Sequence, residues 1–179
     1  MSGRATVSFF FALTLALTFS SRPLAQESTD KVKAHFGKPM LAVFAGATRV
    51  ECFNIEQAPD GDVNDKDHIA GYKIIARGKE RGKAFAAKLV SVLEYEKSVF
   101  GEENRCFIPH HAFRISNGKE SVDVIICVTC QNLHLITRDG TGKAIKTGAA
   151  MEGGRIPYVH CKFGGNEQQI EALIKEALP

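Results

Sequence analysis

The sequence predicts an α+β domain, in which a mostly antiparallel sheet of about five strands carries helices packed on one face. Two observations lead to this prediction. Apolar residues follow the period of a helix in some segments and the alternation of a strand in several shorter ones. Short turns join neighbouring strand segments, which favours antiparallel pairing. With 179 residues, 44% of them hydrophobic, the chain is long enough for one domain with its own core.

Residues 1–25 are predicted to be a secretory signal peptide. A charged start containing Arg4 precedes an apolar run at 7–19, and polar residues follow up to Gln26. The run is shorter than the roughly 20 residues that span a bilayer, and the order of segments is typical of an export signal. We therefore expect a mature protein without its first 20 to 25 residues, located in the periplasm or outside the cell and not attached to a membrane.

The mature chain is predicted to consist of a flexible polar segment, 26–38, and a single domain, 39–179. The domain begins with a short helix at 39–45, because proline is favoured in the first turn of a helix and Gly46 follows its end. Two longer helices are predicted, one at 83–97 and one after Asn166. Each has an apolar stripe, formed by Phe85, Leu89, Val92 and Leu93 in the first and by Ile170, Leu173, Ile174 and Ala177 in the second.

The predicted strands are 49–56, 72–77, 112–116, 121–128 and 132–137. Asn117-Gly118 lies between the third and fourth strands and is a typical hairpin turn. Since the two strands of a hairpin run antiparallel, we expect residues near 110 to lie opposite residues near 126. Residues 139–154 are rich in glycine and polar side chains and are predicted to form a long loop or a weak hairpin.

The charge of the chain argues against nucleic acid as a partner. There are 23 Lys and Arg against 20 Asp and Glu, and two of the basic residues, Arg4 and Arg22, lie in the predicted leader. The mature domain is therefore nearly neutral, and it has no tryptophan to stack on bases. The partner is expected to be a protein or a small molecule, whose identity the sequence does not give.

One cluster of cysteine and histidine residues is the candidate functional site. It consists of Cys106-Phe107-Ile108-Pro109-His110-His111 and, one hairpin later, Cys127-Val128-Thr129-Cys130. The antiparallel hairpin should bring Cys106, one of the two histidines, Cys127 and Cys130 to the same end of the sheet. His110 is the better fourth member, because its separation from Cys106 suits a turn, whereas His111 points to the other face of an extended segment.

Three interpretations of this cluster are open. The first is a metal site with zinc as the candidate metal, in which Cys106, His110, Cys127 and Cys130 are the four tetrahedral ligands. The second is a redox pair formed by Cys127 and Cys130, although the pair leads into a strand and not into a helix N-terminus that would lower a thiol pKa. The third is a structural disulfide from Cys106 to Cys127 or Cys130, which an oxidising compartment would preserve.

The chain has five cysteines, so at least one is free or pairs with another molecule. Cys52 is expected to be a small core residue on a strand. Cys161 follows His160, and this pair could contribute to a site, although adjacent residues of this kind are common by chance.

The segment from Cys106 to about residue 136 resembles a group of small exported bacterial proteins with no assigned activity. The resemblance is carried by Cys106, Pro109 and His111 in a Cys-x-x-Pro-x-His segment, followed by a strand that ends in Cys127-Val128-Thr129-Cys130. It implies that the three cysteines belong together, and it implies no reaction. The sequence thus predicts an exported protein whose Cys/His cluster is structural or metal-binding, and the alternative is a periplasmic thiol-dependent enzyme.

Overall fold

The computed structural model describes residues 24–59, 66–95, 99–100, 106–148, 151–153, 156–163 and 165–178. Nearly all of the predicted signal peptide, residues 1–23, lies outside this part of the chain. The described helices are α1 (Leu24–Ala45), α2 (Lys83–Leu93) and α3 (Glu167–Ala177). None of them is long and apolar enough to cross a membrane.

The strands include all five that the sequence predicts and several more. The predicted ones are β1 (Arg49–Pro59), β3 (Tyr72–Arg77), β6 (His111–Ser116), β7 (Ser121–Cys127) and β8 (Asn132–Arg138). The additional ones are β2 (His68–Ile69), β4 (Arg81–Gly82), β5 (Val99–Phe100), β9 (Ala144–Ile145), β10 (Met151–Gly153) and β11 (Ile156–Lys162).

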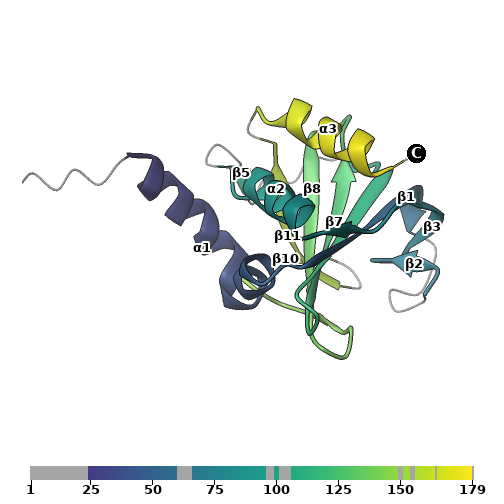
Figure 1. Ribbon diagram of the computed structural model, residues 1–179, viewed down its shortest axis with the longest axis horizontal. Helices are drawn as coiled ribbons and strands as arrows, with labels where there is room; N and C mark the ends of the chain where they lie inside the picture. Colours follow the sequence, from purple (N-terminus) through teal and green to yellow (C-terminus); the bar gives the residue numbers. More distant parts are fainter. Residues whose placement is uncertain are drawn as a thin grey trace, which may run out of the picture.

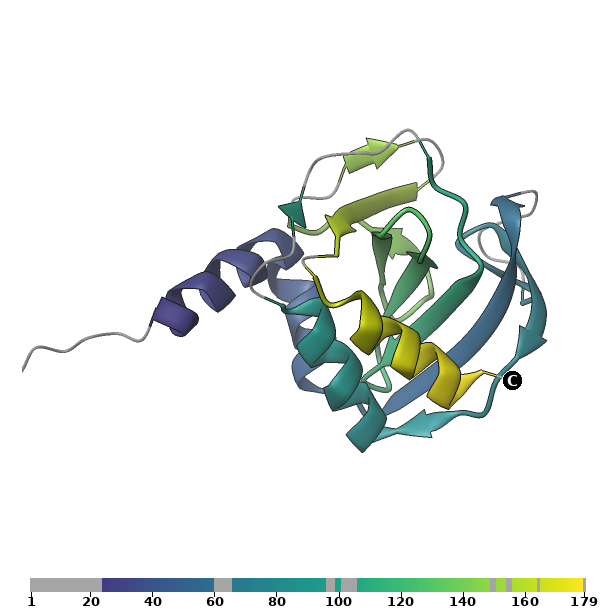
Figure 2. The same cartoon turned by 90° about the horizontal axis from the view of Figure 1, so that it is seen from above.

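The strands form one large antiparallel sheet in the order β10-β11-β8-β7-β6-β1-β3-β2, with β4, β5 and β9 paired at its sides. The sheet curls into a half-barrel, and α2 and α3 lie together against it (Figures 1 and 2). The predicted α+β class is therefore confirmed, and the sheet is larger than the five strands expected.

The β6–β7 hairpin pairs residues near 110 with residues near 126, as the sequence predicts, and the structure gives its register. His111 lies opposite Ile126, and Ser116 lies opposite Ser121. The connection is a four-residue loop, in which the side-chain oxygen of Asn117 accepts hydrogen bonds from the backbone N–H groups of Lys119 and Glu120. Such local bonding by asparagine stabilises tight turns. Residues near 110 and residues near 126 therefore meet at one end of the sheet.

The main core lies between the sheet and the helices. The predicted stripes of α2 and α3 face it, with Phe85, Leu89 and Leu93 buried in α2 and Ile170, Leu173, Ile174 and Ala177 buried in α3. Asn166 stands at the N-cap of α3 without capping it. Its side-chain amide instead donates to the carbonyl of Val92, 2.8 Å away, and so joins the end of α2 to the start of α3.

The first helix differs from the prediction. Residues 26–38, expected to be a flexible segment, belong to α1, in which Val32 and Phe36 are buried. Gly37 interrupts the helix with a φ of 74°, and its backbone passes so close to Gly148 that a Cβ atom on either residue would collide with the other. Only glycine allows this approach and this φ, and Pro39 then begins the second helical part as predicted.

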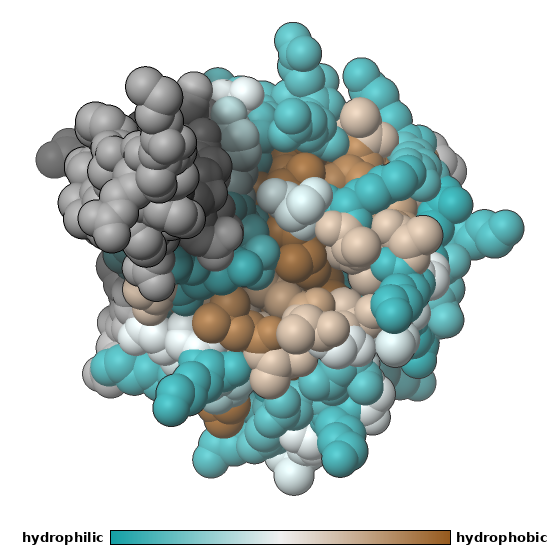
Figure 3. Space-filling view, turned by 60° about the vertical axis from the view of Figure 1, so that its left-hand side comes forward, coloured by the Kyte–Doolittle hydropathy of each residue, from teal (hydrophilic) through white to brown (hydrophobic). Residues whose placement is uncertain are grey.

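Apolar side chains remain at the surface on the side of the molecule that Figure 3 shows, where they gather in a hollow. One groove on the helical side lies between α1 and α2 and is lined by Leu41, Phe44 and Val90. Lys33 and Glu94 form an ion pair of 3.4 Å across it. The contact between the two helices is therefore partly open to solvent.

Candidate functional site

The structure brings Cys106 and Cys130 together. Their sulfur atoms lie 3.1 Å apart, although 24 residues separate them in the chain. The β6–β7 hairpin explains the contact, because it returns the chain from the start of β6 to the end of β7, where the backbone N–H of His110 donates to the carbonyl of Ile126. The proximity expected from the hairpin is confirmed.

Cys127 and Cys130 enclose the tight turn between β7 and β8. The backbone N–H of Cys130 donates to the sulfur of Cys127 over 3.2 Å, and the N–H of Gln131 donates to the carbonyl of Val128. Gln131 has a φ of 56°, a conformation that is uncommon for residues other than glycine and that here closes the turn.

The hydrogen bonds make Cys130 the most acidic of the three thiols. Burial raises its pKa, but the hydrogen bonds from Cys127, Cys106 and the N–H of Ile108 outweigh burial and lower the pKa below its ordinary value. The pKa of Cys106 is raised, first by its hydrogen bond to Cys130. Burial, and then the hydrogen bond to Cys130, raises the pKa of Cys127. A thiolate on Cys130 thus has the thiol of Cys106 beside it as a donor, 3.1 Å away.

The three cysteines also differ in exposure. Cys106 is exposed, Cys130 is partly exposed, and Cys127 is fully buried. A molecule in solution can therefore reach the first two sulfurs, whereas the third is shielded by protein. None of the five cysteines forms a disulfide in this structure.

The predicted zinc site is not supported by the geometry. The described residues contain no group of three or more His, Cys, Asp or Glu side chains placed to hold a metal ion. The prediction used the spacing from Cys106 to His110, which suits a helical turn, but residues 106–110 form no helix. His110 instead lines a groove of about 470 Å³ together with His111, Asn54 and Lys175.

In that groove, Asn54 fixes the orientation of His111. The side-chain oxygen of Asn54 lies 2.9 Å from Nδ1 of His111. Burial, and then the charge of His110, lowers the pKa of His111. The lining of the groove also includes apolar side chains, namely the exposed Ile75 and, at the end of α3, Ile174 and Leu178.

A stack of rings beside the thiols was missed by the sequence analysis. His134 lies between Phe107, with ring centroids 3.6 Å apart, and Tyr158, with centroids 4.1 Å apart. Burial, and then the charge of the neighbouring His160, lowers the pKa of His134 to about 3. His134 is therefore neutral at physiological pH. The alternation of apolar and polar residues around His134 predicts a strand, but it does not show which aromatic rings pack against the imidazole.

Asn132, next to this stack, is unusual because it is buried without polar contacts. Its side chain has no exposed surface, and neither atom of its amide forms a hydrogen bond with the part of the chain described. It lies directly opposite Cys127 in the β7–β8 ladder. Cys127 also affects Tyr72: burial, and then the charge of Cys127, raises the pKa of Tyr72.

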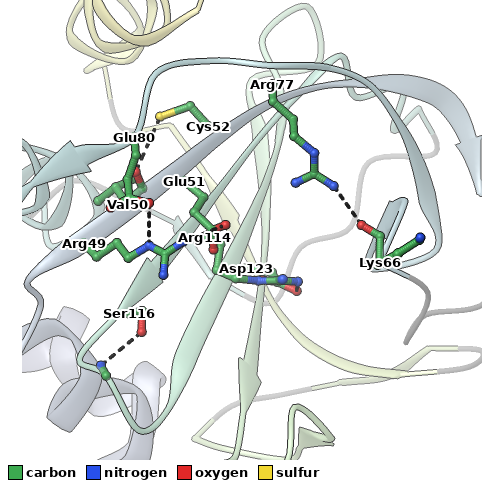
Figure 4. Close-up of polar contacts among 11 residues, drawn as sticks. Arg49, Val50, Glu51, Cys52, Lys66, Arg77, Glu80, Arg114, Ser116 and Asp123 are labelled. Atoms are coloured by element: carbon green, nitrogen blue, oxygen red, sulfur yellow. Dashed lines mark hydrogen bonds and ion pairs between the residues drawn. The ribbon is translucent and has the colours of Figure 1, made fainter.

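The remaining two cysteines lie in the main core. Cys52 and Cys161 are each 1% exposed. The thiol of Cys52 points to the carbonyl of Val50 (Figure 4), and burial raises its pKa to about 11. Both are inert packing residues by the criteria that govern thiol reactivity.

A charged network lies on the opposite face of the sheet from the helices. The carboxylate of Asp123, which has no exposed surface, accepts hydrogen bonds from Arg114 and Arg138 at 2.5–3.1 Å. Figure 4 shows Arg114 extended toward Asp123 from the neighbouring strand. Both carboxylate oxygens are occupied, so the network is structural and leaves no free base.

Compared with known proteins, the chain matches no protein-family model, no curated protein and no solved structure. The case for a function therefore rests on the residues of the site.

Proposed function

We propose that this chain is an exported thiol protein in which Cys106 and Cys130 cycle between a dithiol and a disulfide. The observation that carries the proposal is the distance of 3.1 Å between their sulfurs. A disulfide needs about 2.05 Å, so a movement of about 1 Å closes the bond. An oxidising compartment outside the cytoplasm would allow such a pair to be oxidised.

The hydrogen bonds at the site support a role for Cys130 as the attacking thiol. A thiolate, and not a thiol, is the nucleophile in disulfide exchange. Burial raises the pKa of Cys130, but the neighbouring thiols of Cys127 and Cys106 and the backbone of Ile108 lower it below its ordinary value. These neighbours take the place of the helix N-terminus that activates a thiol in other redox proteins.

The proposed reaction reduces a disulfide bond in a partner molecule and oxidises the Cys106–Cys130 pair. The Cys130 thiolate attacks one sulfur of the partner's disulfide, forms a mixed disulfide and releases the other partner sulfur as a thiolate. The Cys106 thiolate then attacks the Cys130 sulfur, forms the Cys106–Cys130 disulfide and releases the second partner thiol. Two electrons pass from the cysteine pair to the partner, which leaves as a dithiol.

Differential alkylation tests the proposal. The purified protein is equilibrated in glutathione buffers of increasing oxidising strength, quenched with acid, alkylated and digested. We expect a peptide that links Cys106 to Cys130 in the oxidising buffers, with Cys52 and Cys161 alkylated only after denaturation because they are buried. Full alkylation of Cys106 and Cys130 in every buffer contradicts the proposal. So does one equivalent of bound zinc that protects them, since zinc and a disulfide exclude each other at the same sulfurs.

Export is tested by the mass of the protein recovered from the exported fraction. The order of charged, apolar and polar segments in residues 1–25 supports removal of the first 20 to 25 residues. A mass that still includes residues 1–19 contradicts this part of the proposal.

A further inference from the structure

We infer that Cys127 is a second, buried partner for Cys130, so that the disulfide moves between a surface position, Cys106–Cys130, and an interior position, Cys127–Cys130. This inference rests on the proposed redox function and adds a residue to it. It concerns one cluster of three sulfurs, in which Cys130 is the shared member.

The central position of Cys130 is the first observation. Its sulfur lies 3.1 Å from that of Cys106, and its backbone nitrogen lies 3.2 Å from the sulfur of Cys127. The backbone N–H of Cys130 donates to the sulfur of Cys127, which fixes the two residues in one tight turn. Cys130 can therefore form a disulfide with either neighbour without a change in the fold of the sheet.

The difference in exposure is the second observation. Cys106 is exposed and Cys127 has no exposed surface. A disulfide to Cys106 is open to attack by a molecule in solution. A disulfide to Cys127 is shielded, and it leaves Cys106 as a free thiol at the surface. The two positions therefore differ in which sulfur faces the partner.

The polar groups around Cys127 are the third observation. Its sulfur accepts a hydrogen bond from the backbone N–H of Cys130 over 3.2 Å, and a hydrogen bond of this kind favours the thiolate against the effect of burial. The amide of Asn132 lies directly opposite and is buried without a hydrogen-bond partner in the described residues. Side chains opposite each other in an antiparallel ladder have Cβ atoms about 4.5–5.5 Å apart, so this amide can donate to the sulfur when it is ionised. A buried amide that donated to nothing would be costly.

The exchange step needs no oxidant. The Cys127 thiolate attacks the Cys130 sulfur, the Cys127–Cys130 bond forms and the Cys106–Cys130 bond breaks. Cys106 leaves as a thiolate and takes up a proton equivalent to the one that Cys127 lost. The number of disulfides and the number of electrons are unchanged.

Three single variants test the inference: Cys106→Ala, Cys127→Ala and Cys130→Ala. Each is oxidised in glutathione buffer, and linked peptides are identified by mass spectrometry. We expect Cys106→Ala to lose two hydrogen masses and to link Cys127 to Cys130. We expect Cys127→Ala to link Cys106 to Cys130, and Cys130→Ala to form no disulfide within the cluster. Cys52→Ala, altered at a core cysteine, is the control and should behave as the unmodified protein does.

The outcomes separate the inference from the proposed function. If Cys127→Ala is oxidised and Cys106→Ala is not, the inference is wrong and the proposed function stands. If neither variant is oxidised, both the inference and the proposed function are wrong. A link between Cys106 and Cys127 in Cys130→Ala overturns the central role of Cys130.

A measurement on the unmodified protein covers the case in which a variant does not fold. After oxidation and rapid acid quench, the single remaining thiol of the cluster is alkylated and located. We expect two populations, one alkylated at Cys127 and one at Cys106. A sample in which Cys106 is never alkylated overturns the inference.

Discussion

The imidazole of His134 lies flat against the phenyl ring of Phe107, with the ring planes 12° apart and the centroids separated by 3.6 Å. Phe107 follows Cys106 directly, while His134 lies on β8, in the interior of the sheet. This stack anchors the Cys106 segment, which has no regular structure, to the sheet. The position of Cys106 beside Cys130 therefore depends on a contact made by its neighbour.

Replacing Phe107 by alanine should weaken the proposed Cys106–Cys130 disulfide. Aromatic pairs contribute about 0.5–1.5 kcal/mol beyond their buried area. Loss of this stack should lower the effective concentration of Cys106 at Cys130 by about two- to tenfold. Equilibration with reduced and oxidised glutathione measures this quantity. Ile108→Ala is the matched control, because the Ile108 side chain is 43% exposed; an equal decrease in both variants contradicts the anchoring role of the stack.

The partly buried His134 should make the protein less stable in mild acid. Its pKa in the folded protein is lowered to about 3, whereas an unfolded histidine titrates near 6.5. Below pH 6.5 the unfolded chain therefore binds a proton that the folded chain excludes. The free energy of unfolding should fall as the pH drops from 6.5 toward 3, by up to about 1.4 kcal/mol per pH unit from this group.

Urea unfolding at pH 7, 6 and 5 measures this dependence, because most carboxylates stay ionised in that range. His134→Phe keeps an aromatic ring in the stack and removes the titrating group. Unfolding of this variant should take up one proton fewer, so its free energy of unfolding should change less with pH. Identical slopes in His134→Phe and the unmodified protein contradict the prediction.

The features that the sequence predicted well are local ones. The stripes of α2 and α3 follow from a period of 3.6 residues, and both face the core. The pairing of His111 with Ile126 follows from one turn, Asn117-Gly118, between two alternating segments. The contact between Cys106 and Cys130 follows in turn from that register, so the core of the site could be predicted from the sequence.

The features that it missed depend on contacts between distant segments. The kink at Gly37 needs the backbone of Gly148, which no local pattern indicates. Strands of two residues, such as β2 and β9, are too short to show alternation. His110 was placed with the cysteines from its spacing, but the groove that it lines is built by β1, β3 and α3 together.

Leucines on the two apolar stripes should be essential for stability. Leu89 is 1% exposed and Leu173 is 5% exposed, and both lie in the main core. Substitution of a buried leucine by alanine costs about 2–5 kcal/mol, so Leu89→Ala and Leu173→Ala should each lower the free energy of unfolding by that amount. Gln169→Ala, on the exposed side of α3, should change it by less than about 0.5 kcal/mol. Losses in the leucine variants as small as in this control would mean that the stripes do not pack on the sheet.

The buried carboxylate of Asp123 gives the largest expected effect of a single polar change. It has no exposed surface, and it forms ion pairs with two arginines, of which the Arg138 side chain is only 4% exposed. Asp123→Asn keeps the shape of the side chain and removes its charge, so the buried guanidinium group of Arg138 would lose the carboxylate that it pairs with. Removing one partner of a buried ion pair costs about 3–5 kcal/mol, and we expect a loss in this range from urea unfolding at pH 7.

The matched control for Asp123→Asn is Glu56→Gln. Glu56 pairs with Lys73 over 3.5 Å, but both side chains are more than 40% exposed. Water screens such a pair, so this variant should lose less than about 1 kcal/mol. The comparison holds the chemistry of the change constant and varies only burial. If both variants lose the same small amount, the Asp123 network is open to solvent and does not hold β6, β7 and β8 together.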